Sequence, residues 1–324
     1  MNYYLYKLAF DTAVHFGGSS SALSLYHSED HFCADTLFSA LCHAALSLRG
    51  PDALARLCRA AEAEQLLLSD SMPWMDGAYY LPKPAVTARG EREIPAAGRK
   101  AVKKLKWIPA HEFAAFADSV RGGEVYDAER ARADFGVPVG MAKVKITPGA
   151  DSLPYQVGLY RFRRNAGLWF LAGCGTEEIG EELRLFIESL SYSGIGGKTS
   201  AGYGKFHVEE AVFLNESVDE TARWLYSALA NTEAARQLLL SAGLPSDEEL
   251  VELLPDSEYM LIRRAGFIQS DSYAPEGRRK ATQLFLSAGS VLPRRFRAKL
   301  YEVGRAGGHP VYRLSAPLFL GVTL

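Results

Sequence analysis

Residues 194–204 read Gly-Ile-Gly-Gly-Lys-Thr-Ser-Ala-Gly-Tyr-Gly, a loop that holds five glycines, one lysine, a threonine and a serine. A helical pattern of apolar residues from Thr176 to Leu190 precedes the loop, and a strand-like run over 205–213 follows it. Glycines let a backbone approach a ligand closely, and successive N–H groups in such a loop can cradle phosphate oxygens, with Lys198 adding a positive charge. The loop therefore predicts an anion-binding site, and phosphate is the expected ligand.

The phosphate is not predicted to belong to a bound nucleotide. A P-loop needs a glycine five positions before its last glycine, where this chain has Tyr192, and it runs from strand to helix, whereas this loop runs from helix to strand. Two interpretations stay open. The loop binds the backbone of a nucleic acid, or it is a connection without a ligand, although ordering five glycines has a high cost in backbone entropy.

The charge of the chain is segregated along the sequence. A formal net charge of −2 over 324 residues argues against a free-standing, nonspecific nucleic-acid binder, for which a basic domain is expected. Residues 89–106 nevertheless hold seven Lys and Arg against two acids, and residues 263–299 hold nine against two, whereas residues 216–258 hold ten acids against two Arg. This pattern suits a subunit that meets a polyanion on one side and protein on another, although each run taken alone is also typical of a solvated face.

Composition and cysteine usage bound the class of protein. With 48% hydrophobic and 23% charged residues, the chain is expected to be a soluble globular protein of two domains. Its four cysteines show no CxxC pairing, its N-terminus does not read as a signal peptide, and no apolar run is long enough to span a bilayer. We therefore expect a cytoplasmic protein with reduced thiols and no membrane contact.

The order of expected elements predicts an α+β fold with two ferredoxin-like (RRM-like) domains. The first domain is expected over 1–215 and runs strand, helix, strand, helix, glycine loop, strand. Its first helix is expected to be capped by Asp35 and to stop at Gly50-Pro51, with a second short helix over 52–68. An insertion over about 84–160 is expected to project from this domain as a thumb-like region.

The second domain is expected over 216–324 and reads as a degenerate copy of the first. It begins with a connecting helix within the acidic segment 216–235 and includes a helix capped by Ser246. Its expected strands are rich in apolar residues and lie at 237–242, 259–269, 281–291 and 311–322.

Several motifs together resemble a known family. The glycine loop between a helix and a strand resembles the signature of the RAMP proteins of CRISPR systems. Five further stretches, in this order along the chain, resemble the fourth Csm subunit of type III-A effector complexes. They are His15-Phe16-Gly17, Asp35 to Leu41, Tyr259 to Ile268, Leu286 to Val291, and His309 to Arg313.

This resemblance implies a noncatalytic, RNA-binding scaffold without cofactor or metal. Such a subunit binds the 5′ handle of the crRNA and bridges the large Cas polymerase/cyclase-type subunit and the filament of backbone RAMP subunits. Its inserted thumb meets the target RNA only indirectly, through the guide–target duplex. Handle recognition fits the general physics of RNA recognition, in which sequence is read mainly from single strands.

The residues expected at the RNA combine glycines for close approach, cations and hydroxyls for phosphate or 2′-OH, and one tyrosine for stacking. One of Arg263 and Arg264, which point to opposite faces of a strand, is expected to meet RNA or a partner. The full set is His15, Phe16, Gly17, Gly194, Gly196, Gly197, Lys198, Thr199, Ser200, Gly202, Tyr203, Gly204, Arg263, Arg264, Arg278, Arg279, Lys280, His309 and Arg313.

Two other functions stay open from the sequence. The chain could be a metal-independent endoribonuclease that processes CRISPR RNA with His15 as general acid or base, although no partner group for His15 is evident. It could instead be a protein-interaction module that makes no RNA contact. A zinc site is not expected, because His31, Cys33, Cys42 and His43 match no common zinc spacing.

Overall fold

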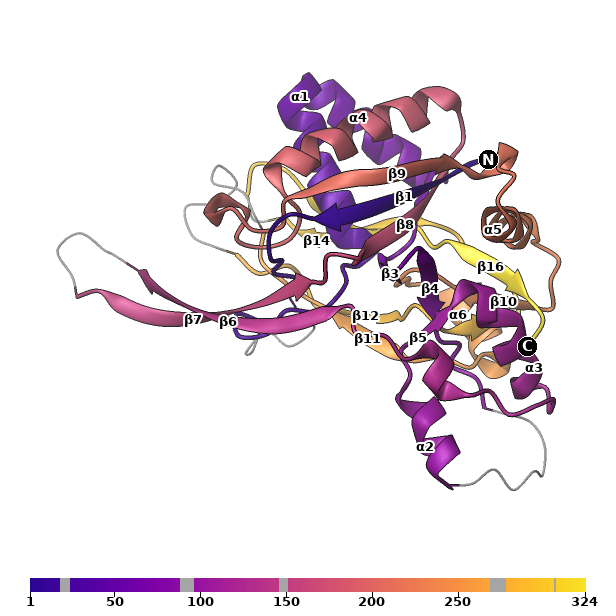
Figure 1. Ribbon diagram of the computed structural model, residues 1–324. Coiled ribbons are helices and arrows are strands. Elements are labelled where there is room, and N and C mark those ends of the chain that lie inside the picture. The colour runs from indigo at the N-terminus through magenta and orange to yellow at the C-terminus, as the bar shows by residue number, and fades with distance from the viewer. Residues whose placement is uncertain (18–23, 88–95, 146–150, 269–277, 306) are drawn as a thin grey trace.

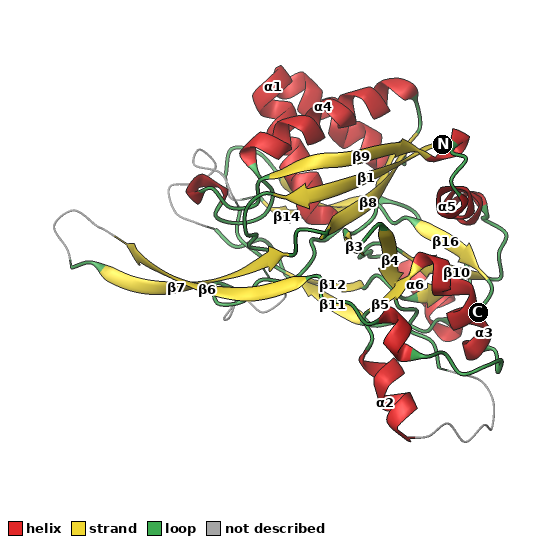
Figure 2. Cartoon of the chain, viewed as in Figure 1, coloured by secondary structure: helices red, strands yellow, loops and turns green. Residues whose placement is uncertain are grey.

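The computed structural model describes residues 1–17, 24–87, 96–145, 151–268, 278–305 and 307–324. One large sheet carries two helices on one face and much of the C-terminal part of the chain on the other, while a long hairpin projects from one side (Figures 1 and 2). Helices and antiparallel sheets are mixed along the chain, in agreement with the predicted α+β class.

The large sheet brings together strands from both ends of the first 215 residues. Its order is β5-β4-β3-β8-β1-β9, with β2 also paired to β8, and the pairs are antiparallel. Every residue of β8 is buried, as its uninterrupted apolar sequence predicted. The strands are β1 (Asn2–Phe10), β2 (Leu66–Leu68), β3 (Met72–Met75), β4 (Ala78–Pro82), β5 (Trp107–Pro109), β8 (Ala166–Cys174) and β9 (Phe206–Phe213).

Helices α1 (Ala34–Glu62) and α4 (Glu177–Ser193) cover one face of this sheet (Figure 2). The α4 prediction is confirmed, since the Thr176 hydroxyl accepts from the backbone N–H of Ile179 and the predicted stripe packs into the core. The predicted cap of α1 is wrong. Cys33 is the N-cap, and the Asp70 carboxylate, far along the chain, accepts from the first N–H of the helix at Ala34 over 2.7 Å.

The expected stop at Gly50-Pro51 is a kink within α1. Gly50 has φ 76°, a conformation in which glycine avoids the strain of a side chain, and the helix resumes after it up to Glu62. The expected helix over 52–68 is therefore shorter than predicted, because residues 66–68 leave it to pair with β8 as strand β2.

Part of the C-terminal region packs on the opposite face of the large sheet, whereas residues 298–300 and 314–316 pack with α1. Leu5, Trp169 and Leu171 of that sheet share a core with Leu225 of α5 (Glu220–Ala230) and with Leu320. The helix expected within 216–235 is thus confirmed as α5. Since both faces of the sheet are buried here, the central strand β8 carries a continuous apolar run rather than an alternating pattern.

The C-terminal strands form small antiparallel sheets. The boundary between the two predicted domains at 215/216 stays a prediction. The three predicted strands after residue 258 are shorter than expected, because positive φ at Gly266 and Gly289 and the ring of Pro317 interrupt them. The sheets are β13-β10-β16, β11-β12 and β14-β15, with the capped helix α6 (Asp247–Leu253) between β10 and β11. The strands are β10 (Arg236–Leu239), β11 (Leu261–Arg264), β12 (Gln283–Leu286), β13 (Val291–Leu292), β14 (Lys299–Gly304), β15 (Val311–Ser315) and β16 (Phe319–Val322).

The segment expected as an insertion forms two projections. Helix α2 (Ala96–Lys104) and helix α3 (Phe113–Val120) lie beside β5, and the hairpin of β6 (Gly136–Lys145) and β7 (Leu153–Phe162) extends away from the body (Figure 1). Val157 and Leu159 anchor the base of the hairpin in a small core of its own. In the described part of the chain, no helix has both the length and the apolar character needed to cross a membrane.

Candidate nucleic-acid interface

A cavity of about 480 Å³ opens where four segments meet. Its walls come from the loop after β1, the first three turns of α1, the glycine loop, and the C-terminal part of the chain around β11, with residues 279–282 and Arg313. It is lined by five Arg and Lys side chains and by two carboxylates, which leaves an excess of three positive charges when its histidines are neutral. The cationic residues are Arg263, Arg264, Arg279, Lys280 and Arg313, and all five were predicted from the sequence as RNA contacts.

The loop after β1 supplies a fixed part of the wall. His15 is only 7% exposed, and its Nδ1 donates to the Gly158 carbonyl of β7 over 2.7 Å. Phe16 is buried against Phe32, with ring centres 5.4 Å apart, so it is chiefly a core residue rather than an exposed platform for a base. Gly17 borders the cavity with no atom close to its missing side chain.

The glycine loop folds tightly onto this wall. The backbone N–H groups of Gly197 and Gly204 donate to the carbonyls of His15 and Ala13 over 2.8 and 2.9 Å, so these two groups are not available to a phosphate. A Cβ on Gly196 would lie 2.8 Å from the His15 carbonyl oxygen. Three further positions, Gly194, Gly202 and Gly204, have φ of +88°, +84° and +77°. Close packing and backbone conformation therefore account for most of these glycines without a ligand.

The other side of the glycine loop meets the hairpin. The Tyr203 hydroxyl donates to the Met141 sulfur over 2.6 Å, and the Lys143 ammonium lies 4.7 Å from the centre of the Tyr203 ring. The Lys198 ammonium lies 5.5 Å from the Tyr155 ring centre. Tyr203 is thus packed on the hairpin and is not a free stacking surface. Lys198, Thr199 and Ser200 lie outside the cavity lining, with Lys198 and Ser200 exposed.

Asp35, which sequence reasoning assigned to a helix cap, holds two of the predicted RNA-binding arginines. Arg264 donates to both carboxylate oxygens, over 2.5 and 3.1 Å, and the Arg313 Nε lies 3.4 Å from one of them. Arg313 also donates to the Ala281 carbonyl and to Gln283. Burial alone would raise the pKa of Asp35, but the charge and hydrogen bonds of Arg264, helped by Arg313, outweigh it and lower the pKa.

The expectation that Arg264 and Arg313 are free to bind RNA is therefore corrected. Their side chains are 11% and 2% exposed, and they join α1 to β11 and β15 through Asp35. Arg263 points to the opposite face of β11 from Arg264, as predicted, and is exposed.

The remaining predicted cations differ in their exposure. Arg278 and Arg279 are exposed, and the Arg279 guanidinium lies 5.4 Å from the ring centre of Phe267. Lys280 is partly buried, and burial, opposed by Asp35 but reinforced by the two paired arginines, lowers its pKa. His309 is exposed and is not part of the cavity wall. The prediction that it lies with the other RNA contacts is therefore not supported.

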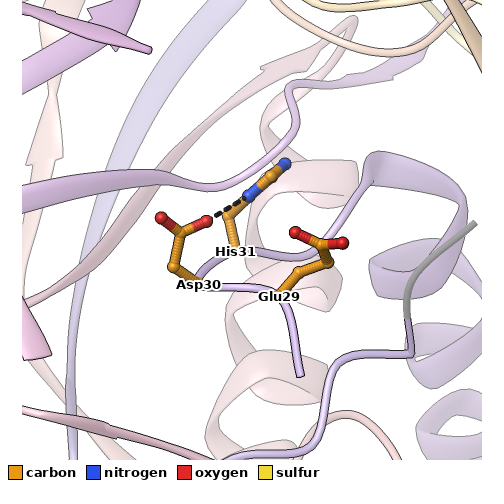
Figure 3. Close-up of side chains that lie close together, drawn as sticks. All are labelled: Glu29, Asp30 and His31. Carbon is orange, nitrogen blue, oxygen red and sulfur yellow. Dashed lines mark hydrogen bonds and ion pairs between the residues drawn. The ribbon is translucent and has the colours of Figure 1, made fainter. Parts of the chain in front are cut away.

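Sequence reasoning missed an acidic and histidine-bearing rim of the cavity. Glu29, Asp30 and His31 place possible ligand atoms within 4.8 Å of one another, and the Asp30 carboxylate accepts from His31 over 2.8 Å (Figure 3). Burial favours a raised pKa for Asp30, but the hydrogen bond and charge of His31 and the charge of Lys106 lower it. The run Glu-Asp-His directly before the first helix was the signal that could have drawn notice. Glu29 and His31 line the cavity.

The chain has clear relatives among known proteins. A family model described as the CRISPR Csm4 C-terminal domain matches residues 232–322. The CRISPR system protein Csm4 of Mycobacterium tuberculosis is 33% identical over 326 residues, covering 99% of this chain and 98% of the relative. The chain belongs to the Csm4 family of CRISPR proteins. The resemblance drawn from the glycine loop and the five other motifs is thereby confirmed at the level of the family.

Other Csm4 proteins match over the same length. The one from Streptococcus thermophilus is 28% identical, covering 98% of both chains. Among solved structures, a chain from the crystal structure of a Csm3–Csm4 subcomplex of the type III-A interference complex matches with a TM-score of 0.61 at 18% identity, covering 99% of both chains. A chain from a Csm1–Csm4 cassette with cA4 matches with a TM-score of 0.59 at 18% identity, covering 99% of this chain and 98% of that one. The fold is thus that of Csm4-family proteins.

Proposed function

We propose that this Csm4-family chain is the noncatalytic subunit of a type III-A Csm complex that binds the 5′ handle of the crRNA. The observation that carries this proposal is the cavity with its excess of three positive charges. It is lined by the loop at His15, the glycine loop and the C-terminal cations. These segments are more than 60 residues apart in sequence, and all three were predicted from the sequence to contact RNA. RNA is bound mainly through phosphate contacts that position it and pockets that accept splayed bases.

Three cations are the proposed phosphate contacts. Arg263 and Arg279 are exposed at the cavity, and Lys280 lies deeper, beside the arginines held by Asp35. Because Asp35 balances only part of the charge of Arg264 and Arg313, the inner wall keeps a positive potential without offering those two side chains directly. A phosphate near Lys280 would relieve the mutual repulsion of these cations.

The same proposal includes the finer architecture and the partners. The strand order β9-β1-β8 with β2 beside β8, covered by α1 and α4, supports a ferredoxin-like first domain, and the β6–β7 hairpin is the proposed thumb. The solved relatives are found with Csm3 or with Csm1. We infer a corresponding position here, between the large polymerase/cyclase-type subunit and the backbone RAMP subunits, with target RNA met only indirectly.

The endoribonuclease alternative has one observation in its favour, which is that His15 lines the cavity. Its Nδ1 is fixed by the Gly158 carbonyl, which leaves Nε2 as the only ring nitrogen for proton transfer. General acid–base cleavage of RNA needs a second titratable group in reach of the reacting atoms. Among the described residues, no titratable side chain hydrogen-bonds to His15, which supports a scaffold over an enzyme.

Co-purification from the native host tests the proposal. The tagged chain should retain uniform short RNAs that share a 5′ end, together with companion subunits. The Arg279→Gln/Lys280→Gln variant should lose most of this RNA, whereas Arg49→Gln/Arg59→Gln, exposed on the far half of α1, should keep it. Recovery of the chain without RNA refutes the proposal. Cleavage of RNA by the isolated chain in EDTA, abolished in His15→Ala, would establish the enzyme instead.

A further inference from the structure

Helix α2 and the residue pair after it display a set of lysines on the surface. Lys100, Lys103, Lys104 and Lys106 are all exposed, and the first three follow the i, i+3, i+4 spacing that puts side chains on one helix face. In the described ranges of the chain, no ion pair within 4.0 Å involves any of the four. We call these four side chains the lysine ridge.

The structure of α2 itself does not require these charges. Basic residues near a helix C-terminus commonly stabilise the last carbonyls. Here Lys83, directly after β4, does this, since its ammonium donates to the carbonyls of Val102 and Lys103 over 3.1 and 3.3 Å. Burial and the neighbouring charge of Lys103 lower the pKa of Lys83. The exposed lysines therefore add repulsion around a helix end that is already satisfied.

The lysine ridge is continuous with the rim of the cavity. Lys106 directly precedes Trp107, whose ring meets the His31 ring edge to face with centres 5.3 Å apart, and His31 lines the cavity. The charge of Lys106 also reaches the Asp30 carboxylate beside His31. In Figure 1, α2 projects at the lower end of the molecule, away from α1 and α4 at the upper end. An RNA strand that leaves the cavity past His31 would thus meet Lys106 first and α2 next.

We propose that the lysine ridge carries the phosphate backbone of a single-stranded RNA whose other part occupies the cavity. This inference rests on the proposed function, because it extends the same RNA path. Lysine ammonium groups bind phosphate as point charges without a demand on base identity, which suits a sequence-independent path. The ridge adds affinity and salt dependence, whereas the cavity gives specificity.

An acidic protein partner fits the lysine ridge less well. Cores of protein interfaces are depleted in lysine and are built around aromatic, Met and Arg anchors. None of the exposed large apolar side chains of the described chain lies between residues 96 and 106. The ridge therefore lacks an apolar centre of the kind on which a stable protein interface is built.

The test measures how RNA affinity depends on salt. The full chain is titrated against fluorescein-labelled oligouridine of increasing length at several salt concentrations, with anisotropy as readout. The ridge variant is Lys100→Gln/Lys103→Gln/Lys104→Gln, in which glutamine keeps the helix propensity. Its matched control is Arg49→Gln/Arg59→Gln/Arg184→Gln, which removes the same charge from exposed positions on α1 and α4. Unchanged circular dichroism melting curves establish that each variant is folded.

Each phosphate contact with a single strand contributes roughly 0.7 to the slope of log K against log salt. If each of the three substituted lysines contacts one phosphate, the slope therefore becomes shallower by about 2 in the ridge variant. The loss should appear only with oligomers long enough to leave the cavity. An unchanged slope, equal to that of the control, overturns the ridge while a loss of binding in Arg279→Gln/Lys280→Gln still supports the proposed function. An unchanged slope with loss of a protein partner in pull-down makes the ridge a protein surface. No binding by the wild-type chain refutes both proposals.

Discussion

Asp35→Asn removes the negative charge that holds two buried arginines while it keeps the size of the side chain. The Asp35 and Arg264 side chains are 11% exposed and that of Arg313 is 2% exposed, so water cannot replace the lost partner. Removing one partner of a buried ion pair leaves an uncompensated charge and costs about 3–5 kcal/mol. Lys280 adds a third cation nearby, since Asp35 and both arginines act on its pKa. We expect a cost in this range, which is a large part of the 5–15 kcal/mol typical of a folded protein.

Urea unfolding followed by circular dichroism measures this cost. The matched control is Glu129→Gln, which breaks the exposed pair with Arg132 and should cost less than about 1 kcal/mol. A double-mutant cycle with Arg264→Met adds a second criterion, because the cost of the double variant should fall well below the sum of the two single variants. A loss under about 1 kcal/mol in Asp35→Asn, or additive single costs, would refute the view that Asp35 locks α1 to the C-terminal strands.

Three further predictions concern a buried acid and the glycine loop. Burial, opposed by hydrogen bonds from the N–H groups of Ala34 and Ala242, raises the pKa of Asp70 from 3.8 to about 6. The folded state then binds the proton more tightly than the unfolded state, so the free energy of unfolding should fall by about 3 kcal/mol as pH rises from about 4 to 6. Thermal melts across this pH range should show this loss of stability in the wild-type chain and not in Asp70→Asn. Gly204→Ala should cost about 1–3 kcal/mol more than Gly202→Ala in urea unfolding, because its Cβ would lie 2.1 Å from the Ile195 carbonyl oxygen. Gly202→Ala meets no atom within 4 Å and should cost only the roughly 1–2 kcal/mol of a left-handed conformation. Equal costs would contradict this. Tyr203→Phe should lower stability by less than about 1.5 kcal/mol, since it removes only the hydrogen bond to Met141, and a larger loss of melting temperature would show that the hydroxyl has another role.

Local signals predicted the parts of the fold that depend on neighbouring residues. The apolar stripe and Thr176 cap of α4, the capping box of Ser246 and the buried run of β8 each appear as predicted. All three are read within about ten residues, where periodicity and capping chemistry operate. The positions of glycines in the loop over 194–204 were likewise informative, because a tight loop needs φ values that other residues avoid.

Contacts between distant segments could not be read in this way. The Asp35–Arg264 pair spans 229 positions, and nothing local distinguishes an arginine that binds a carboxylate from one that binds phosphate. Asp35 lies within the first turn of α1, where an acid commonly serves the helix dipole, so the sequence favoured a cap. The same limit applies to Asp70, whose carboxylate accepts from α1 and from the C-terminal part of the chain at once.

The glycine loop has two structural tasks, and this decides which variants can report on RNA binding. Through Gly197 and Gly204 it is bonded to the wall at residues 13–15, and through Tyr203 it holds the hairpin. A side chain added at Gly197 would meet the His15 ring of the wall, and one added at Gly204 would meet the Ile195 carbonyl within the loop itself. A loss of RNA binding in such a variant would therefore not show a lost contact. Arg279 and Lys280 can be changed without altering any backbone conformation of the loop. Variants of these two cations therefore test for a contact with RNA, and the glycine variants measure how far the cavity depends on the loop that shapes it.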